Sequence, residues 1–466
     1  MVDQTDKNGT WSKERKKINR TALLAVALAA IMITTFFAGY FVRGITEPVL
    51  GEIWEIIQGT SVYTKDMTED ELAELFVKAT LKDDKYAKYY SPKEYAKIRE
   101  EDKGRYSGVG IGIAEDNNTG DVKVAKVYIN SSAYKKNVKA GDILVGGIKK
   151  GETEYTDFKV AVSEYNQDKE EDEKITVLSV VNDFFADFII GDDIKLKIKQ
   201  GSAEPEEKTL NKEKYNVSYV EYKDEEEHYY FSTETSGIER LNPIEINVLP
   251  CLDTDTAYIK LYEFEGDAAA QFNKALEYMR TRGKTKLILD LRDNGGGLVD
   301  ILLNIASYLI NYNDAADIRV LNFKDKISDS HYSTNKNRFY KGENQLTDIS
   351  VIANTKTASA SECLIGALSD YGNREAFNGA SFSIEERLIL TEHNDTRGYF
   401  CTYGKGIMQS TYSLKSGGAL QLTTAQIFWP ISWTCVQDVG IQTVPENCVS
   451  DEDAIARANE VLHPLP

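Results

Sequence analysis

Two stretches of the chain join a run of apolar residues to a helical pattern, and each predicts a buried strand followed by a helix. In the first, Lys286–Leu291 is the strand, Leu298–Ile310 is an amphipathic helix, and glycines form the turn between them. In the second, Ile349–Ala353 is the strand and Glu362–Leu368 the helix. Apolar strands that alternate with helices are typical of a sheet covered by helices. We therefore expect an α/β core with a mixed sheet and flanking helices.

The turn of the second unit contains the segment Thr357-Ala358-Ser359-Ala360-Ser361-Glu362. A strand-to-helix turn exposes a hydroxyl and directs free backbone N–H groups toward whatever it attacks. The hydroxyl of Ser359 needs a neighbour to take its proton, and a buried lysine, whose pKa burial lowers, can do so. Lys405 lies between two glycines that allow close packing, and Gln409 lies four residues further on, where it could orient the lysine amine. Taken alone, each segment is more typical of small-residue packing or a surface turn.

The glycine turn of the first unit, Asn294–Gly297, is the third informative segment. It lacks the lysine and hydroxyl of a phosphate-binding P-loop and the spacing of a dinucleotide fingerprint. A glycine N–H can approach a developing negative charge without a side chain in the way. An oxyanion hole is therefore the better interpretation.

Together, the three segments resemble the C-terminal processing peptidases of peptidase family S41, which are serine endopeptidases with a Ser-Lys-Gln arrangement. The resemblance runs from about Leu50 to the end of the chain. It implies that Ser359 is the nucleophile, Lys405 the base and Gln409 its partner. It further implies that the N–H groups of Gly296 and Ala360 form the oxyanion hole, and that no metal or other cofactor is needed.

The spacing between the two central residues leaves a second interpretation open. Ser359 and Lys405 are 46 residues apart (405 minus 359), which is wider than the family pattern, with the extra residues near 384–401. An inserted hairpin would keep the two residues together. If Lys405 were misplaced, the chain would instead be a catalytically silent module that binds protein tails.

The segment Ser107–Ile113 begins a further unit. It is similar to the glycine loop of a PDZ domain, whose N–H groups can hold a peptide carboxylate while the next strand pairs with the peptide. Later features fit this order: a short helix at 133–137, a turn and strand at 139–144, a helix at 177–190 with Val177, Val181, Phe184 and Phe188, and strands at 194–198 and 215–222. The resemblance implies that a substrate carboxylate binds at Gly108, Val109, Gly110 and Ile111.

The amino-terminal region predicts a membrane anchor. Residues 21–42 form a run of 22 residues without a charge, which is long enough to cross a bilayer as a helix. A cluster of basic residues lies just before the run: Lys13, Arg15, Lys16, Lys17 and Arg20. Because the basic side stays in the cytoplasm, we expect a single-pass protein of the cell membrane with its catalytic region outside. Cleavage of the run and secretion is the alternative.

Composition and motifs argue against several other functions, although a Ser-His-Asp site assembled across the fold stays open. The formal net charge is −19, which argues against nucleic acid as a partner because a phosphate binder needs a basic face. Neither a His-Glu-x-x-His nor a Cys-x-x-Cys motif for zinc is present. The four histidines stand in no setting that suggests a Ser-His-Asp triad: His228, His331, His393 and His463.

The sequence thus predicts five segments. They are a cytoplasmic tail (1–20), a signal anchor (21–43), a helical region (44–104) in which Met67–Thr80 has helical periodicity, a PDZ domain (105–222) and a peptidase core (223–466). The expected partners are protein or peptide substrates bound by their C-terminal tails. The sequence leaves open the natural substrate, self-association, and whether the PDZ unit activates or inhibits.

Overall fold

The structure is a computed structural model that describes most of the chain after residue 67. The described residues are 68–103, 105–116, 118–170, 174–312, 317–334, 337–372, 381–391 and 400–464. The chain divides into two compact units, 1–76 and 77–466. Of the first unit, only 68–76 is described, and it contains the start of helix α3 (Glu69–Thr80).

The expected cytoplasmic tail and signal anchor, residues 1–43, lie outside the described residues. Within the part of the chain that the structure describes, no helix has both the length and the apolar character needed to cross a bilayer. Membrane attachment therefore stays a prediction from the sequence.

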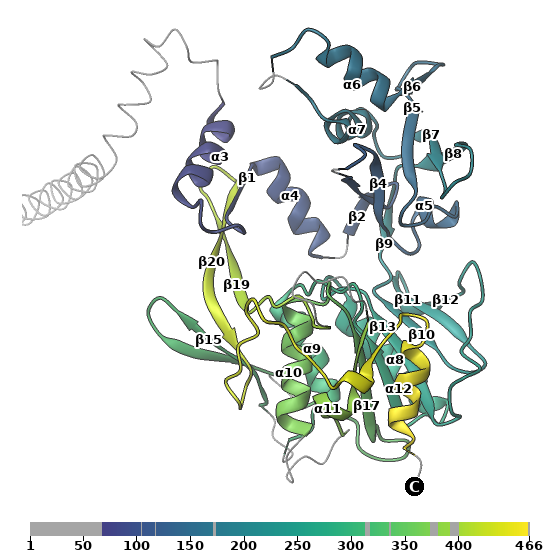
Figure 1. The fold of residues 1–466 in the computed structure, drawn as a ribbon, viewed down its shortest axis with the longest axis vertical. Coiled ribbons are helices and arrows are strands. Elements are labelled where there is room, and N and C mark those ends of the chain that lie inside the picture. The colour runs from purple at the N-terminus through teal and green to yellow at the C-terminus, as the bar shows by residue number, and fades with distance from the viewer. Residues whose placement is uncertain are drawn as a thin grey trace, which may run out of the picture. The chain divides into compact units, whose positions relative to one another are not determined.

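An eight-stranded mixed sheet forms the core of the second unit (Figure 1), as the sequence predicts. Its first three strands pair antiparallel and its last five, β13 to β21, pair parallel. In spatial order the strands are β12 (Gly237–Leu241), β11 (His228–Glu234), β10 (Val220–Lys223), β13 (Thr256–Leu261), β14 (Lys286–Asp290), β17 (Asp348–Ala353), β18 (Leu388–Thr391) and β21 (Cys448–Val449).

Helices cover both faces of this sheet, and α10 (Ala360–Gly372) and α12 (Ala454–Leu462) lie on opposite sides of strand β17 in Figure 1. Helices α8 (Ala268–Thr281), α9 (Val299–Leu309) and α10 pack on one face, and α12 packs on the other. The apolar middle of strand β14, Leu287–Leu289, is covered on both of its faces. Leu287 and Leu289 face the first group of helices, whereas Ile288 faces α12.

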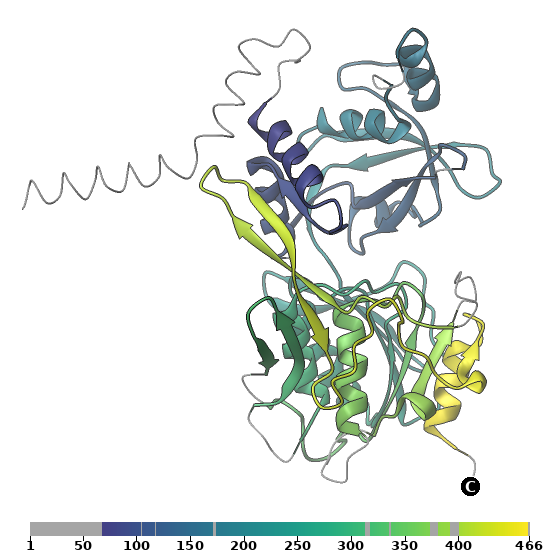
Figure 2. The same ribbon diagram turned by 60° about the vertical axis from the view of Figure 1, so that its left-hand side comes forward.

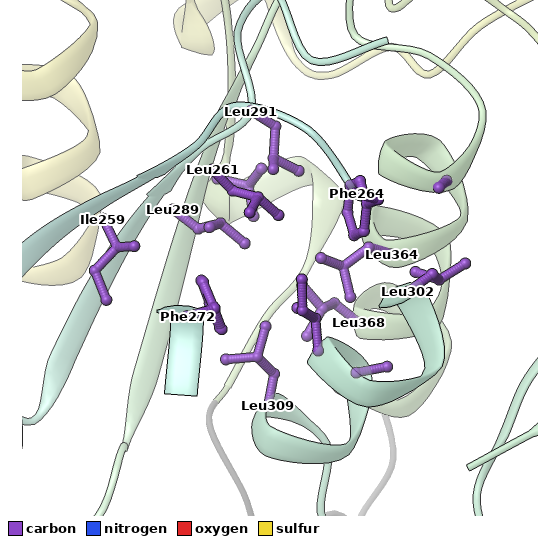
Figure 3. Close-up of a cluster of buried hydrophobic side chains, with 14 of the residues drawn as sticks. Ile259, Leu261, Phe264, Phe272, Leu289, Leu291, Leu302, Leu309, Leu364 and Leu368 are labelled. Carbon is purple, nitrogen blue, oxygen red and sulfur yellow. The ribbon is translucent and has the colours of Figure 1, made fainter. Parts of the chain in front are cut away.

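Figure 3 shows the larger core cluster, in which Leu302 and Leu309 of α9 lie with Leu364 and Leu368 of α10 beside the sheet. All four leucines are fully buried. Burial of a leucine side chain stabilises the fold by about 1.5–3 kcal/mol. This packing holds the two strand-to-helix turns at the same edge of the sheet.

A second sheet of five strands contains a long hairpin, β19 to β20 (Figure 2). The short strand β1 pairs antiparallel with β20, so a segment from early in the chain joins one near the end. The strands are β1 (Lys88–Tyr90), β15 (Arg319–Asp325), β16 (Asp329–Ser333), β19 (Ile407–Ser413) and β20 (Ala419–Phe428). Helix α4 (Pro92–Glu101) follows β1, and its N-terminus is capped by Ser91.

The region expected to be a PDZ domain contains a six-stranded sheet with helices. Strand order is β3-β4-β5-β7-β8, with β6 paired to β5, and β2 pairs separately with β9. The strands are β2 (Arg105–Gly108), β3 (Ile111–Glu115), β4 (Val122–Val127), β5 (Ile143–Ile148), β6 (Tyr155–Asp157), β7 (Asp193–Lys199), β8 (Glu206–Asn211) and β9 (Glu213–Asn216). The helices are α5 (Ser132–Lys135), α6 (Phe158–Asn166) and α7 (Val177–Ala186).

Three details differ from the sequence prediction. Strand β10 pairs in the eight-stranded sheet, so a boundary after residue 222 cuts a core strand. Helix α7 ends at Ala186 and not at 190. Residues 384–391 are not part of a hairpin: they form helix α11 (Ile384–Arg387) and strand β18, which lies between β17 and β21. The remaining short helix is η2 (Pro445–Asn447).

Candidate active site

Ser359 lies immediately before helix α10 and has a strained backbone. Its φ is +56°, in the left-handed region, which costs a residue with a side chain roughly 1–2 kcal/mol. Surrounding contacts hold this conformation. The Ser359 N–H donates to Glu362 Oε2 at 2.9 Å, and the Ala358 N–H donates to the Asn294 carbonyl at 3.1 Å. Strain of this kind persists only where neighbouring groups enforce it, and it is concentrated at functional sites.

The two expected oxyanion donors differ in their present partners. Ala360 is the first residue of α10, so its N–H has no partner within the helix, and it donates to no other described group. The Gly296 N–H, in contrast, donates to Asn294 Oδ1 at 2.9 Å. The N–H of Gly297 donates to no described group. The Ala360 N–H is therefore free to act, whereas the Gly296 N–H would first have to leave Asn294.

Gly296 packs directly against the serine turn. Its φ is +99°, and a Cβ at this position would lie 2.8 Å from the Ala360 nitrogen and 2.9 Å from the Ala358 oxygen. Real Cβ atoms do not approach backbone atoms so closely, and φ here also favours glycine. The glycine turn and the serine turn therefore fit together only without a side chain at this position.

Lys405 lies beside the serine turn and is half-buried. Its N–H donates to Glu362 Oε2 at 2.9 Å, and its ammonium nitrogen lies 4.7 Å from the centre of the Tyr86 ring. The pKa of Lys405 is lowered, first by burial and then by the charge of Lys85, while Glu362 acts in the opposite direction. A lowered pKa is what a lysine needs in order to accept a proton at neutral pH.

Glu362 links the serine turn to the lysine segment. Its carboxylate is fully buried and accepts four hydrogen bonds, two at each oxygen. Oε2 accepts from the Ser359 and Lys405 amides, and Oε1 accepts from the Thr402 hydroxyl at 2.5 Å and the Gly404 amide at 2.8 Å. One side chain thus fixes the backbone on both sides of the site. No local pattern in the sequence marks this residue.

Gln409 lies in β19, next to a bulge between Met408 and Gln409. Its Nε2 donates to the Thr423 hydroxyl at 3.2 Å, and it makes no hydrogen bond to Lys405 among the described residues. The bulge changes the alternation of side chains along the strand. The even spacing of Lys405 and Gln409 therefore does not place their side chains on the same face of the strand.

A cavity of about 510 Å³ brings the expected site residues together. Its lining includes all five of them: Gly296, Ser359, Ala360, Lys405 and Gln409. Within the described residues, no hydrogen bond joins the Ser359 hydroxyl to the Lys405 nitrogen. Catalytic hydrogen bonds are often long before substrate binds, so the arrangement remains compatible with proton transfer.

Three acidic residues line the cavity, and no local pattern in the sequence indicates them. Asp102, Glu263 and Glu265 line it together with apolar residues such as Ile98 and Leu302. Burial raises the pKa of Glu265, and its Oε2 accepts a hydrogen bond from the Tyr106 hydroxyl at 2.8 Å. Tyr106 belongs to β2, so this bond connects the cavity to the strand that precedes the expected carboxylate loop.

The expected carboxylate loop, Gly108–Ile111, is tightly packed. The Gly110 carbonyl accepts from the Tyr128 N–H and the Val109 carbonyl from the Ala133 N–H, whereas the Val109 and Gly110 N–H groups donate to no described group. A Cβ at Gly110 would lie 2.0 Å from the Ser131 Cβ. The four apolar residues expected on α7 are all buried in the core, so any groove would be lined by others: Leu178, Val180 and Phe185 are only partly buried.

No histidine is among the described residues that line the cavity with Ser359. His228 is hydrogen-bonded to Glu221, and His463 contacts Thr256 and Lys286. Over the described part of the chain, no group of three His, Cys, Asp or Glu residues could hold a metal ion.

Comparisons with known proteins agree on one family. Residues 255–382 match the model described as peptidase family S41. "Carboxyl-terminal-processing peptidase 2, chloroplastic" of Arabidopsis thaliana is 25% identical over 412 residues, 87% of this chain and 66% of the relative. "Probable CtpA-like serine protease" of Staphylococcus saprophyticus is 21% identical over 448 residues, 92% of this chain and 74% of the relative.

Among solved structures, the "photosystem II D1 C-terminal processing protease" is 20% identical and has a TM-score of 0.46, covering 87% of this chain and 90% of that one. This chain spans just under two thirds of the length of the Arabidopsis relative. The matched family region includes Gly296 and Ser359 and ends before Lys405.

Proposed function

Residues 255–382 of this chain form a peptidase family S41 region, and on this premise we propose that the protein is a serine endopeptidase with a Ser-Lys-Gln site. The observation that carries the proposal is the cavity of about 510 Å³ lined by Ser359, Lys405 and Gln409. A strained serine at the start of a helix, beside a lysine with a lowered pKa, is suited to nucleophilic attack on a carbonyl.

In the proposed mechanism, the Ser359 hydroxyl attacks the carbonyl carbon of a peptide bond while the neutral Lys405 amine takes its proton. The Ala360 N–H stabilises the oxyanion, together with an N–H from the glycine turn, either Gly296 after release from Asn294 or Gly297. Lys405 then gives the proton to the leaving amine. A water molecule hydrolyses the ester at Ser359 and regenerates the hydroxyl.

We propose that substrates are presented by their C-terminal tails to the Gly108–Ile111 loop of a PDZ domain. The two N–H groups without described partners, those of Val109 and Gly110, support this role because a peptide carboxylate needs such donors. We also propose that residues 21–43 anchor the protein in the cell membrane with the catalytic region outside. Protease accessibility of the catalytic region in intact cells tests the orientation.

The proposed activity is tested with the purified full chain and an unstructured polypeptide that ends in an apolar tail. We expect the parent to produce fragments, and the Ser359→Ala and Lys405→Met variants to produce none above background. Matched controls are Ser416→Ala and Lys415→Met, at an exposed serine and an exposed lysine between β19 and β20. Cleavage by Ser359→Ala at the parent's rate would overturn the assignment.

The second candidate is a catalytically silent module that binds protein tails. It is favoured by one observation: the Lys405 nitrogen makes no hydrogen bond to the Ser359 hydroxyl among the described residues. In the same experiment, this candidate predicts that the parent binds the polypeptide without producing fragments. Replacement of Gly110 by alanine should then weaken binding, because its Cβ would collide with Ser131.

A further inference from the structure

Asp84 lies far from the proposed catalytic residues in sequence but is connected to them through the hairpin β19 to β20. Its carboxylate accepts from both the backbone N–H and the hydroxyl of Thr423, each at 2.8 Å. The same carboxylate accepts from the Tyr86 N–H at 3.0 Å. Asp84 therefore contacts one residue that binds Gln409 and another whose ring faces Lys405.

The first connection determines which way the Gln409 amide points. Asp84 is an acceptor, because burial alone would raise its pKa but the hydrogen bonds from Thr423, Tyr86 and Ala87 outweigh burial and lower it. The Thr423 hydroxyl has one hydrogen, and it is donated to Asp84. The Thr423 oxygen can then only accept, so it must face the NH₂ group of Gln409.

This orientation leaves the other end of the amide available. The Gln409 Oε1 has no hydrogen-bond partner among the described residues. An amide oxygen can accept a hydrogen bond from an ammonium group, whereas an amide NH₂ group would repel it. With Asp84 ionised, the acceptor end of Gln409 is kept for a donor such as Lys405.

The second connection concerns the surroundings of Lys405. The Tyr86 N–H is fixed by Asp84, and the Tyr86 ring centre lies 4.7 Å from the Lys405 nitrogen. A ring at this distance attracts the ammonium and shields it from water. The pairing of β1 with β20 holds this segment on the hairpin.

We propose that Asp84 is a positioning residue for the Ser-Lys-Gln site: it orients the Gln409 amide through Thr423 and holds the Tyr86 ring against Lys405. This inference rests on the proposed peptidase function. It assigns a catalytic purpose to the segment 84–90, which precedes the expected PDZ domain and is distant in sequence from the peptidase core.

The experiment measures kcat and KM for cleavage of an unstructured polypeptide by the full chain. We expect Asp84→Asn to lower kcat about tenfold to a hundredfold with little change in KM. An asparagine has one acceptor oxygen, so its NH₂ group must face one of the Thr423 donors. Asp83→Asn is the matched control, since Asp83 is the exposed neighbour, and it should leave kcat unchanged.

Two further variants separate positioning from simple loss of structure. Thr423→Val keeps the shape and the backbone N–H but removes the hydroxyl, and it should lower kcat as Asp84→Asn does. Thr423→Ser restores a hydroxyl and should restore most of kcat. In a Gln409→Ala background, Asp84→Asn should cost much less than in the parent, because one of its targets is already missing.

These variants distinguish failure of the role of Asp84 from failure of the proposed peptidase function. If Ser359→Ala retains the parent's activity, the peptidase proposal itself fails. If Ser359→Ala is inactive but Asp84→Asn and Thr423→Val both retain the parent's kcat, only the role of Asp84 is overturned. The role of Asp84 would also be overturned if Asp84→Asn lowered kcat by the same factor in the Gln409→Ala background as in the parent. The loss of kcat would then not depend on Gln409.

Discussion

Replacement of Glu362 tests whether one buried carboxylate holds the serine and lysine segments together. Glu362 accepts four hydrogen bonds at distances of 2.5–2.9 Å, two at each oxygen. In Glu362→Gln, one oxygen is replaced by an NH₂ group, and in Glu362→Ala both acceptors are lost. The two variants should therefore differ in a graded way.

The expected loss in the free energy of unfolding depends on which donors lose their acceptor. In Glu362→Gln, the remaining side-chain oxygen would stay toward the Ser359 and Lys405 amides, because the Thr402 hydroxyl can rotate to accept from the new NH₂ group. The Gly404 N–H, which cannot rotate, then loses its acceptor, at a cost of about 1–3 kcal/mol. Glu362→Ala leaves all four donors without acceptors and should cost more than about 4 kcal/mol.

The assay is urea unfolding of the full chain, combined with kcat/KM for the same polypeptide substrate. We expect Glu362→Gln to retain measurable cleavage, and Glu362→Ala to be inactive even under conditions in which it remains folded. The exposed Glu386 provides the control: Glu386→Ala should change the free energy of unfolding by less than about 0.5 kcal/mol. A Glu362→Ala protein within about 1 kcal/mol of the parent, with unchanged activity, would refute the reasoning.

Two other predictions concern the glycine turn and the lysine. In steady-state cleavage, Gly296→Ala should lower kcat/KM about a hundredfold, because the new Cβ would lie 2.8 Å from the Ala360 nitrogen. A Cβ at Gly295 would have no other atom within 4 Å, so the control Gly295→Ala should change kcat/KM less than about threefold. Because only the neutral amine of Lys405 accepts a proton, kcat/KM should rise with pH through its lowered pKa. Lys85→Met removes a neighbouring positive charge, so it should raise the pKa of Lys405 and move the rise in kcat/KM to higher pH. The exposed Lys82 provides the control, and Lys82→Met should leave the pH profile unchanged. Both profiles are measured at low salt, where charges interact most strongly.

The sequence predicted the two strand-to-helix units well because their signals are local. Helix α9 begins and ends within one residue of the predicted Leu298–Ile310, and α10 contains the predicted Glu362–Leu368. Continuous apolar runs show that a strand is covered on both faces, and in the first unit glycines also mark the end of the strand. Those two signals were enough to bring Gly296 and Ser359 to the same edge of the sheet.

Contacts between distant segments could not be predicted in the same way. Asp84 and Thr423 are 339 residues apart, and Glu362 and Thr402 are 40 apart. In the sequence, Asp84 and Glu362 look like ordinary polar residues, because no pattern of neighbouring residues indicates a distant hydrogen-bond partner. The partner of Gln409 was missed for the same reason, together with the bulge that changes the direction of its side chain.

The sheet also corrected the interpretation of residues 384–391. Their position between Ser359 and Lys405 suggested an inserted hairpin, but β18 is a parallel strand of the central sheet. A parallel strand needs a crossover connection and not a tight turn, so its pairing depends on the path of the whole chain. The Ser359-to-Lys405 spacing therefore includes part of the core.

The central claim is that Ser359 attacks a carbonyl while Lys405 takes its proton, and the most direct measurement is to trap the acyl group. The full chain is mixed with an activated peptide ester, quenched in acid within one turnover and digested for mass spectrometry. We predict an acyl group on the peptide that contains Ser359, and none in the Lys405→Met protein. An acyl group on a different residue, or on Ser359 to the same extent without Lys405, would contradict the account.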